Sequence, residues 1–321
     1  MKLKLLKTKG SFLNTDKKLQ LRLLTAPTVV ALGDSSVYGV GDCENEKAGS
    51  ELGWTGRLAH DLNAGKYINL SRNGARAQDV WQSQLAAAVA ARPDLVLICI
   101  GGNDALRNNF KPVQVAKYLY LTISNLQATG AVVAILGLHD PSLIAPAPKI
   151  IKNILRTRVL QINAALRWVS DQTSATLIET IDRPEIYERK FWHIDRMHPG
   201  PIGHQYISDL VRRTLSLPRR SNKKIQHETE LDRKAKAIWL ITNGFKWLAR
   251  RSIDLLPAML FLVGRELIKS RSLNWTHPEY FKIYLEHILS QLFKEEISKH
   301  MESSKNEPLN FDDLQLQIVS A

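Results

Sequence analysis

Short apolar runs alternate along the chain with longer segments in which apolar residues recur every three or four positions. The apolar runs cover residues 28–32, 67–70, 95–100, 131–136 and 175–179. Runs of this length are typical of strands that are buried on both faces. The longer segments have the spacing of amphipathic helices and cover residues 53–62, 77–90, 112–127, 150–173 and 202–215. The alternation predicts an α/β fold, a three-layer α/β/α sandwich with a parallel sheet.

The composition changes near Pro218. The segment that follows, residues 218–236, is polar and dense in charge, which is typical of a linker or a solvated helix start. We therefore expect a basic N-terminal tail over residues 1–26, an α/β domain over residues 27–217, and a helical extension with a polar tail over residues 218–321.

The whole chain has the composition of a soluble globular protein, with 44% hydrophobic and 23% charged residues. Its net charge of +13 favours binding to an anionic surface. The charge alone does not indicate whether that surface is nucleic acid or acidic lipid. The N-terminus lacks the apolar core of a signal peptide, and no run of about 18 apolar residues marks a membrane span. Cys43 and Cys99 imply neither a disulfide framework nor a cysteine metal site. We therefore expect a cytoplasmic protein.

A serine stands just beyond the first predicted strand, in the sequence Gly33-Asp34-Ser35-Ser36. The glycine permits a sharp turn that exposes the Ser35 hydroxyl, which is then placed to act as a nucleophile. An isolated serine at such a position more often caps a turn. The interpretation of Ser35 as a nucleophile therefore depends on the groups that accompany it.

Those groups follow later strands of the predicted sheet. His198 can take the proton of a serine hydroxyl, while Asp195, three residues earlier, can hold the imidazole in the required tautomer. Pro199 favours an extended backbone at His198. The Asn103 amide, after the third strand, and the Gly74 N–H, after the second, can donate hydrogen bonds to a developing oxyanion.

These segments together resemble a known family. In chain order they are Gly33-Asp34-Ser35, a glycine after the second strand, Gly101-x-Asn103-Asp104 and Asp195-x-x-His198-Pro199. This order matches the four sequence blocks of the SGNH (GDSL) hydrolases, and the resemblance covers about residues 27–217. The family usually has Leu or Ile after the nucleophile, where this chain has Ser36.

The resemblance implies a flavodoxin-like sandwich and a serine hydrolase that needs no cofactor. It implies a catalytic triad of Ser35, Asp195 and His198. It also implies an oxyanion hole formed by the N–H groups of Ser35 and Gly74 and by the side chain of Asn103. The family acts on esters and thioesters of very different size, including lysophospholipids, acyl thioesters and acetylated sugars, so membership does not fix the substrate.

Other types of site fit the sequence less well. The pentapeptide around Ser35 lacks the second glycine of the nucleophile elbow of α/β-hydrolases. Gly39-Val40-Gly41 is not part of a nucleotide-binding motif. His193, Asp195 and His198 can be drawn as metal ligands, but two histidines and one aspartate on a short loop fit a triad loop better. We therefore expect no metal.

We favour an acyl or lysophospholipid ester as the small-molecule substrate. Arg72, Arg76 and Arg107 lie close in sequence to the oxyanion groups and favour an anionic substrate, although solvated arginines are commoner. Phe191 and Trp192, with the loop 140–149, are expected to form an apolar wall. The alternatives are an acyltransferase or a carbohydrate acetylesterase on the same scaffold, and a non-catalytic membrane-associated binding protein. We expect no nucleic-acid partner.

The extension mixes aromatic and basic residues. In residues 235–269, tryptophan and leucine are interleaved with lysine and arginine, which is typical of an interfacial helix, and Pro257 predicts two shorter helices. One hypothesis is peripheral contact with the inner face of an anionic membrane. The slightly favoured alternative is that these apolar residues pack on the α/β domain or on a second copy. The sequence does not fix the oligomeric state.

Overall fold

The computed structural model describes residues 24–42, 53–145 and 147–221. The predicted N-terminal tail, except for its last three residues, and the predicted extension, except for residues 218–221, lie outside these ranges. The domain boundary near Pro218 and the membrane contact of the extension therefore remain predictions.

The described residues form a parallel sheet in which the strand order is β2-β1-β3-β4-β5. The strands are β1 (Thr28–Gly33), β2 (Lys66–Asn69), β3 (Leu95–Cys99), β4 (Val132–Leu136) and β5 (Thr176–Ile178). Each strand overlaps one of the predicted apolar runs. The order is that of the flavodoxin-like fold, and it reverses between β1 and β3. Functional groups are therefore expected beyond the carboxyl ends of these two strands.

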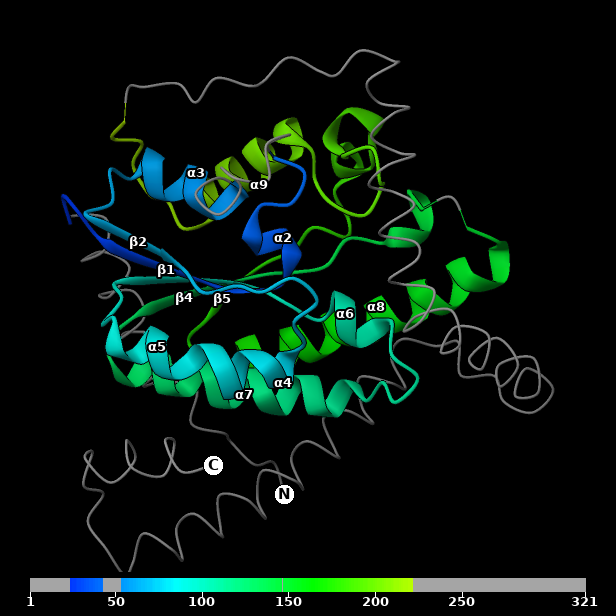
Figure 1. Ribbon diagram of the computed structural model, residues 1–321, viewed down its shortest axis with the longest axis horizontal. Coiled ribbons are helices and arrows are strands. Elements are labelled where there is room, and N and C mark those ends of the chain that lie inside the picture. Colours follow the sequence, from blue (N-terminus) through cyan, green and yellow to red (C-terminus); the bar gives the residue numbers. More distant parts are fainter. Residues whose placement is uncertain (1–23, 43–52, 146, 222–321) are drawn as a thin grey trace, which may run out of the picture. The chain divides into compact units, whose positions relative to one another are not determined.

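Helices cover both faces of the sheet, so the predicted three-layer sandwich is confirmed (Figure 1). One face carries α2 (Ser35–Tyr38), α3 (Gly53–Asp61) and α9 (Pro201–Thr214). The other carries α4 (Ala77–Asp79), α5 (Leu85–Ala90), α7 (Pro112–Ala128) and α8 (Lys149–Gln172). The short helix α6 (Gly102–Ala105) follows β3, and single 3₁₀ turns are η2 (Pro141–Leu143), η3 (Pro184–Tyr187) and η4 (Arg189–Phe191). Across residues 24–42, 53–145 and 147–221, no helix is both long and apolar enough to cross a bilayer.

The burial of each strand accounts for the pattern of apolar residues in its sequence. All residues of β3 and β4 are buried, and so are all but the first of β1, because helices cover both faces of these central strands. Such strands read as continuous apolar runs. The edge strands β2 and β5 are mostly half-buried, and Lys66 is exposed. The core is therefore centred on β1, β3 and β4, and their carboxyl ends form a rigid base for a site.

The predicted single helix over residues 77–90 is wrong in detail. The structure has α4, then the π-helix η1 (Val80–Gln84), and then α5. A π-helix holds one residue more than an α-helix would over the same turn, and such insertions are common at functional sites. Here the wider turn ends at Gln84, which is buried.

Candidate active site

The turn after β1 is closely packed around Gly33. Its φ of 143° favours glycine, and a β-carbon there would overlap the carbonyl oxygen of Cys99 on the neighbouring strand β3. Asp34 then caps α2, because its carboxylate accepts a hydrogen bond from the Ser36 N–H at 2.9 Å. Ser35 is thereby held as the first residue of α2, at the carboxyl edge of the sheet.

Gln84 clamps the strand end that precedes this turn. Its side-chain oxygen accepts a hydrogen bond from the Gly33 N–H at 2.9 Å, and its amide nitrogen donates to the Gly33 carbonyl at 2.9 Å. Both backbone groups of Gly33 are therefore paired with one buried side chain. Nothing in the local sequence indicates this contact, because it joins residues 51 positions apart.

The loop after η4 brings Asp195 and His198 to Ser35. His198 Nε2 lies 2.8 Å from Ser35 Oγ, and His198 Nδ1 lies 2.7 Å from Asp195 Oδ2. A carboxylate only accepts hydrogen bonds, so the Nδ1 atom must carry the proton and Nε2 is left to accept the hydroxyl proton of Ser35. The three residues that the sequence proposed as a triad thus form one hydrogen-bonded chain.

The Asp195 carboxylate has further partners that fix its position. Its Oδ1 atom accepts hydrogen bonds from the N–H groups of Met197 at 2.9 Å and His198 at 3.1 Å. Its Oδ2 atom also lies 3.4 Å from Nδ1 of His193. Burial alone would raise the pKa of Asp195, but hydrogen bonds from His193 and His198 outweigh burial and hold the pKa well below its usual range. The carboxylate therefore stays charged beside His198.

Ser36 is separated from the histidine by its own hydrogen bond. Its hydroxyl donates to Asp34 Oδ1 at 2.8 Å, whereas the Ser35 hydroxyl lies against His198. Burial raises the pKa of the Asp34 carboxyl, and the two hydrogen bonds from Ser36 oppose that effect. Of the two adjacent serines, Ser35 is the one whose hydroxyl lies within hydrogen-bonding distance of His198.

The predicted oxyanion groups surround the same turn. Asn103, on α6, donates from Nδ2 to the carbonyl of Ala75 at 3.1 Å and lies 3.3 Å from Asp34 Oδ2. Gly74 directly precedes Ala75 and has a φ of 82°, so the turn after β2 needs a residue that tolerates the left-handed region. The Asn103 side chain thus lies between the turn that contains Ser35 and the turn that contains Gly74.

The two aromatic residues of the predicted apolar wall have different surroundings. Phe191 was expected to line an apolar wall, but it is buried and packs edge-on against Tyr206 of α9, so that part of the prediction is wrong. Trp192 is half-buried, and its ring lies 4.2 Å from that of His139, which follows β4. Cys99 is buried in β3, and burial raises the pKa of its thiol to about 12, which is typical of a core residue rather than a reactive thiol.

Comparison with known proteins identifies a family that this chain matches. The sequence pattern of the GDSL-like lipase/acylhydrolase family matches residues 31–206. Among solved structures, acetylxylan esterase Axe2 from Geobacillus stearothermophilus is 15% identical, with a TM-score of 0.50; the match covers 63% of this chain and 100% of Axe2. Esterase EstA from Pseudoalteromonas sp. is 20% identical, with a TM-score of 0.47 and coverage of 59% and 97%. At such identities the likeness concerns the fold alone. No curated protein is significantly similar in sequence.

Proposed function

The chain belongs to the GDSL-like lipase/acylhydrolase family, and we propose that it hydrolyses a carboxylic ester or thioester through an acyl-enzyme formed on Ser35. The observation that carries the proposal is the continuous hydrogen-bonded chain from Ser35 Oγ through His198 to Asp195, with distances of 2.8 and 2.7 Å. A serine hydroxyl is a weak nucleophile until a base takes its proton. In this arrangement His198 is the base, and Asp195 is the group that orients it.

The first half of the reaction forms the acyl-enzyme. Ser35 Oγ attacks the carbonyl carbon of the substrate while its proton passes to Nε2 of His198. The Asp195 carboxylate stabilises the imidazolium that forms. The tetrahedral intermediate then collapses, the bond to the alcohol or thiol breaks, and the leaving group takes the proton from His198. The second half repeats these steps with water as the nucleophile, which releases the acid and restores Ser35.

The negative charge of the intermediate requires hydrogen-bond donors. We assign this role to the N–H groups of Ser35 and Gly74 and to the amide of Asn103. The hydrogen bond from Asn103 to Ala75 anchors the amide, and its longer contact of 3.3 Å with Asp34 is the one that the oxyanion replaces. Because the charge exists fully only in the intermediate, these donors act on turnover more than on binding.

An ester panel graded by acyl length tests the proposal. It includes a lysophospholipid, an acyl thioester and an acetylated xylan oligosaccharide, and we expect hydrolysis of acyl or lysophospholipid esters by the wild type. Ser35→Ala should abolish both hydrolysis and labelling by a fluorophosphonate, whereas the matched control Ser36→Ala should retain most of both. The opposite pattern would show that the nucleophile is misassigned. Acyl transfer to an added alcohol, in preference to water, would instead identify an acyltransferase.

A further inference from the structure

A hollow that is open to solvent borders the segments that hold the proposed oxyanion groups. Among the residues that the structure describes, its lining includes three basic side chains, Arg76, Arg107 and Lys111, and one acidic side chain, Asp104. We propose that this basic hollow binds an anionic group, a phosphate or carboxylate, of the ester substrate. The proposal rests on the proposed function and names the substrate class more closely.

The charge balance of the hollow favours an anion. Arg76 pairs with Asp79 at 3.5 Å, and Arg107 and Lys111 line the same space. Asp104 accepts a hydrogen bond from the Ala77 N–H at 3.2 Å, and its burial raises its pKa to about 7. Near neutral pH this carboxyl therefore carries only part of a negative charge, and the positive charges dominate.

The wall of the hollow is held in place by a buried arginine. Arg158 of α8 donates hydrogen bonds to the carbonyls of Ala105 at 2.8 Å and Arg107 at 2.6 Å. Its guanidinium also lies 5.1 Å from the ring centre of Phe110, which lines the hollow. The backbone that carries Arg107 and Phe110 is thus fixed before a ligand arrives, which lowers the entropy that binding would cost.

The beginning of α7 adds to the positive potential. Lys111 is the N-cap of this helix of 17 residues, Pro112 follows it, and the first turn contains no acidic residue. The N-terminus of a helix carries the positive end of its dipole and favours anions. The helix end therefore reinforces the basic side chains that line the same hollow.

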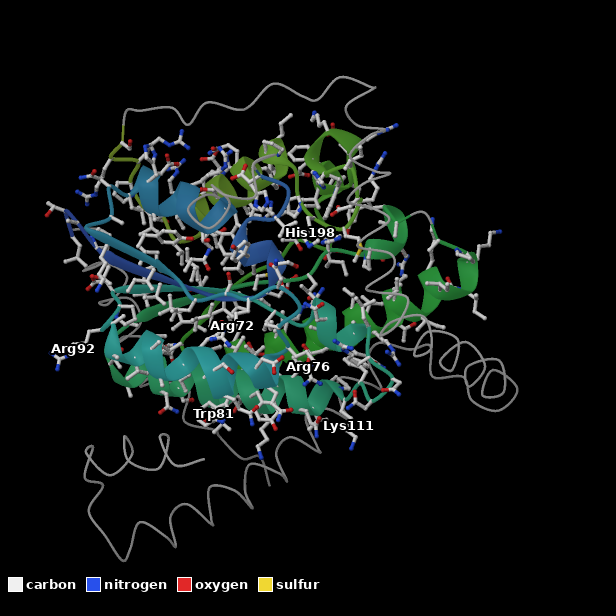
Figure 2. The ribbon with its side chains drawn as sticks, in the orientation of Figure 1. Arg72, Arg76, Trp81, Arg92, Lys111 and His198 are labelled. Carbon is white, nitrogen blue, oxygen red and sulfur yellow. The ribbon has the colours of Figure 1, made fainter. Side chains whose placement is uncertain are left out.

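Two residues that line the hollow are close in sequence to the proposed oxyanion groups. Asp104 directly follows Asn103, and Arg76 lies two residues after Gly74. The hydrogen bond from Asn103 to Ala75 joins these two segments. In Figure 2, Arg76 and Lys111 lie toward the end of the α4 and α7 layer that is nearer His198, while Arg92 lies at the opposite end. An anionic group held in the hollow would thus help to place the ester carbonyl against Ser35.

Titration with inorganic phosphate tests the binding site directly. The double variant Arg76→Gln/Lys111→Gln should weaken phosphate binding at least about tenfold, because two charge-assisted contacts are lost. The matched control Lys66→Gln/Arg92→Gln removes the same charge from exposed side chains elsewhere. It should change binding less than about twofold. Equal weakening in both variants, or no phosphate binding by the wild type, would overturn the proposal.

Enzyme kinetics distinguish whether the hollow binds an anionic group of the substrate or a free anion. The paired substrates are butanoylglycerol and butanoylglycerol 3-phosphate, which differ only in the phosphate. The ratio of kcat/KM for the anionic over the neutral ester should fall about tenfold in the hollow variant and stay constant in the control. An unchanged ratio with lost phosphate binding would show a site for free phosphate and overturn the substrate assignment.

Ser35→Ala separates this proposal from the proposed function. That variant should bind phosphate as tightly as the wild type, because the hollow does not include Ser35. If the wild type hydrolysed neither ester, the proposed function would fail, and the substrate assignment would fail with it. The phosphate titrations would still report whether the hollow binds anions.

Discussion

The serine site and the basic hollow are built in different ways, although Asn103 and Asp104 are adjacent in the sequence. In the serine site, each proposed triad side chain has a hydrogen-bond partner within 2.9 Å. In the hollow, cations on long side chains surround open space, and the ion pair between Arg76 and Asp79 spans 3.5 Å. Covalent chemistry requires fixed distances between reacting atoms. Charge attraction decreases only slowly with distance and tolerates mobile side chains.

This difference sets the expected size of each perturbation. A substitution in the serine site removes a hydrogen-bonded arrangement that no other residue can replace. Turnover should therefore fall by orders of magnitude. A change in the hollow removes part of a summed charge, so it should alter substrate selectivity by about tenfold and not by several orders of magnitude.

The largest effect is expected for His198→Ala. Without the base, Ser35 stays protonated, and turnover of a reactive ester should fall by up to a factor on the order of 10⁶. The double variant with Ser35→Ala should lose little more, because the two groups act as a unit. His60→Ala, at a histidine of α3 whose Nε2 atom lies 3.3 Å from Ser221 Oγ, serves as control and should keep wild-type turnover.

The next largest effect is expected for Asp195→Asn. An amide would misplace the imidazole proton, so kcat should fall by a factor on the order of 10⁴ while the fold is retained. The exposed residue Asp171 offers the matched control Asp171→Asn. Steady-state kinetics with circular dichroism would check both points. Normal turnover in Asp195→Asn would show that the base is oriented by another group.

A smaller effect on turnover is expected for Asn103→Ala. Loss of one oxyanion donor should lower kcat by roughly a hundred- to a thousandfold, about 3 to 4 kcal/mol, with little change in KM. Asn125→Ala, on the exposed side of α7, is the control and should leave kcat unchanged. A change confined to KM would mean that Asn103 binds the ground-state substrate only.

The smallest effect is expected for Asp104→Asn, and it concerns stability. The pKa of Asp104 is about 7 in the folded chain and near 3.8 when unfolded, so wild-type stability falls as the pH rises from about 4 to 7. The amide cannot ionise. The variant should therefore gain about 1 to 3 kcal/mol relative to the wild type between pH 4 and 8. Urea unfolding at several pH values would measure this gain, and a constant difference would disprove it.

Asp104→Asn also probes the boundary between the two regions. We expect kcat for a neutral ester to change far less than in Asn103→Ala, because the Asp104 carboxylate bonds to the backbone of α4 rather than to the turn with Ser35. An equal loss of kcat would mean that the hollow and the serine site function as one unit.

The sequence predicts the sheet and the proposed triad because both depend on local patterns. Buried parallel strands read as apolar runs, and Ser35, Asn103 and His198 each stand in a short motif at the end of a strand or on a loop. The paired contacts of Gln84 and the approach of His193 to Asp195 were not predicted. The Gln84 contact joins residues that are 51 positions apart, so it depends on tertiary packing. The approach of His193 to Asp195 depends on the conformation of the loop that contains both residues.

The error over Phe191 has the same origin. Phe191 ends the 3₁₀ turn η4 and Trp192 follows it in extended backbone, and their side chains pack against different partners. The structure directs Phe191 into the core against α9 and leaves Trp192 beside His139. Which of two neighbouring aromatic residues faces inward is decided by the tertiary packing, and the sequence contains no signal for it.

The π-helix η1 makes the site sensitive to the length of a segment that contributes no reacting atom. The turn over Val80–Gln84 already holds one residue more than an α-helical turn, so a further inserted residue would rotate the residues beyond the insertion by about 100°. Insertion of one alanine after the exposed Ser83 should then cost far more turnover than Ser83→Ala. Gln84 would lose its two bonds to Gly33, and the turn that presents Ser35 would lose its clamp. Insertions in this helix are therefore constrained as strictly as substitutions in the site itself.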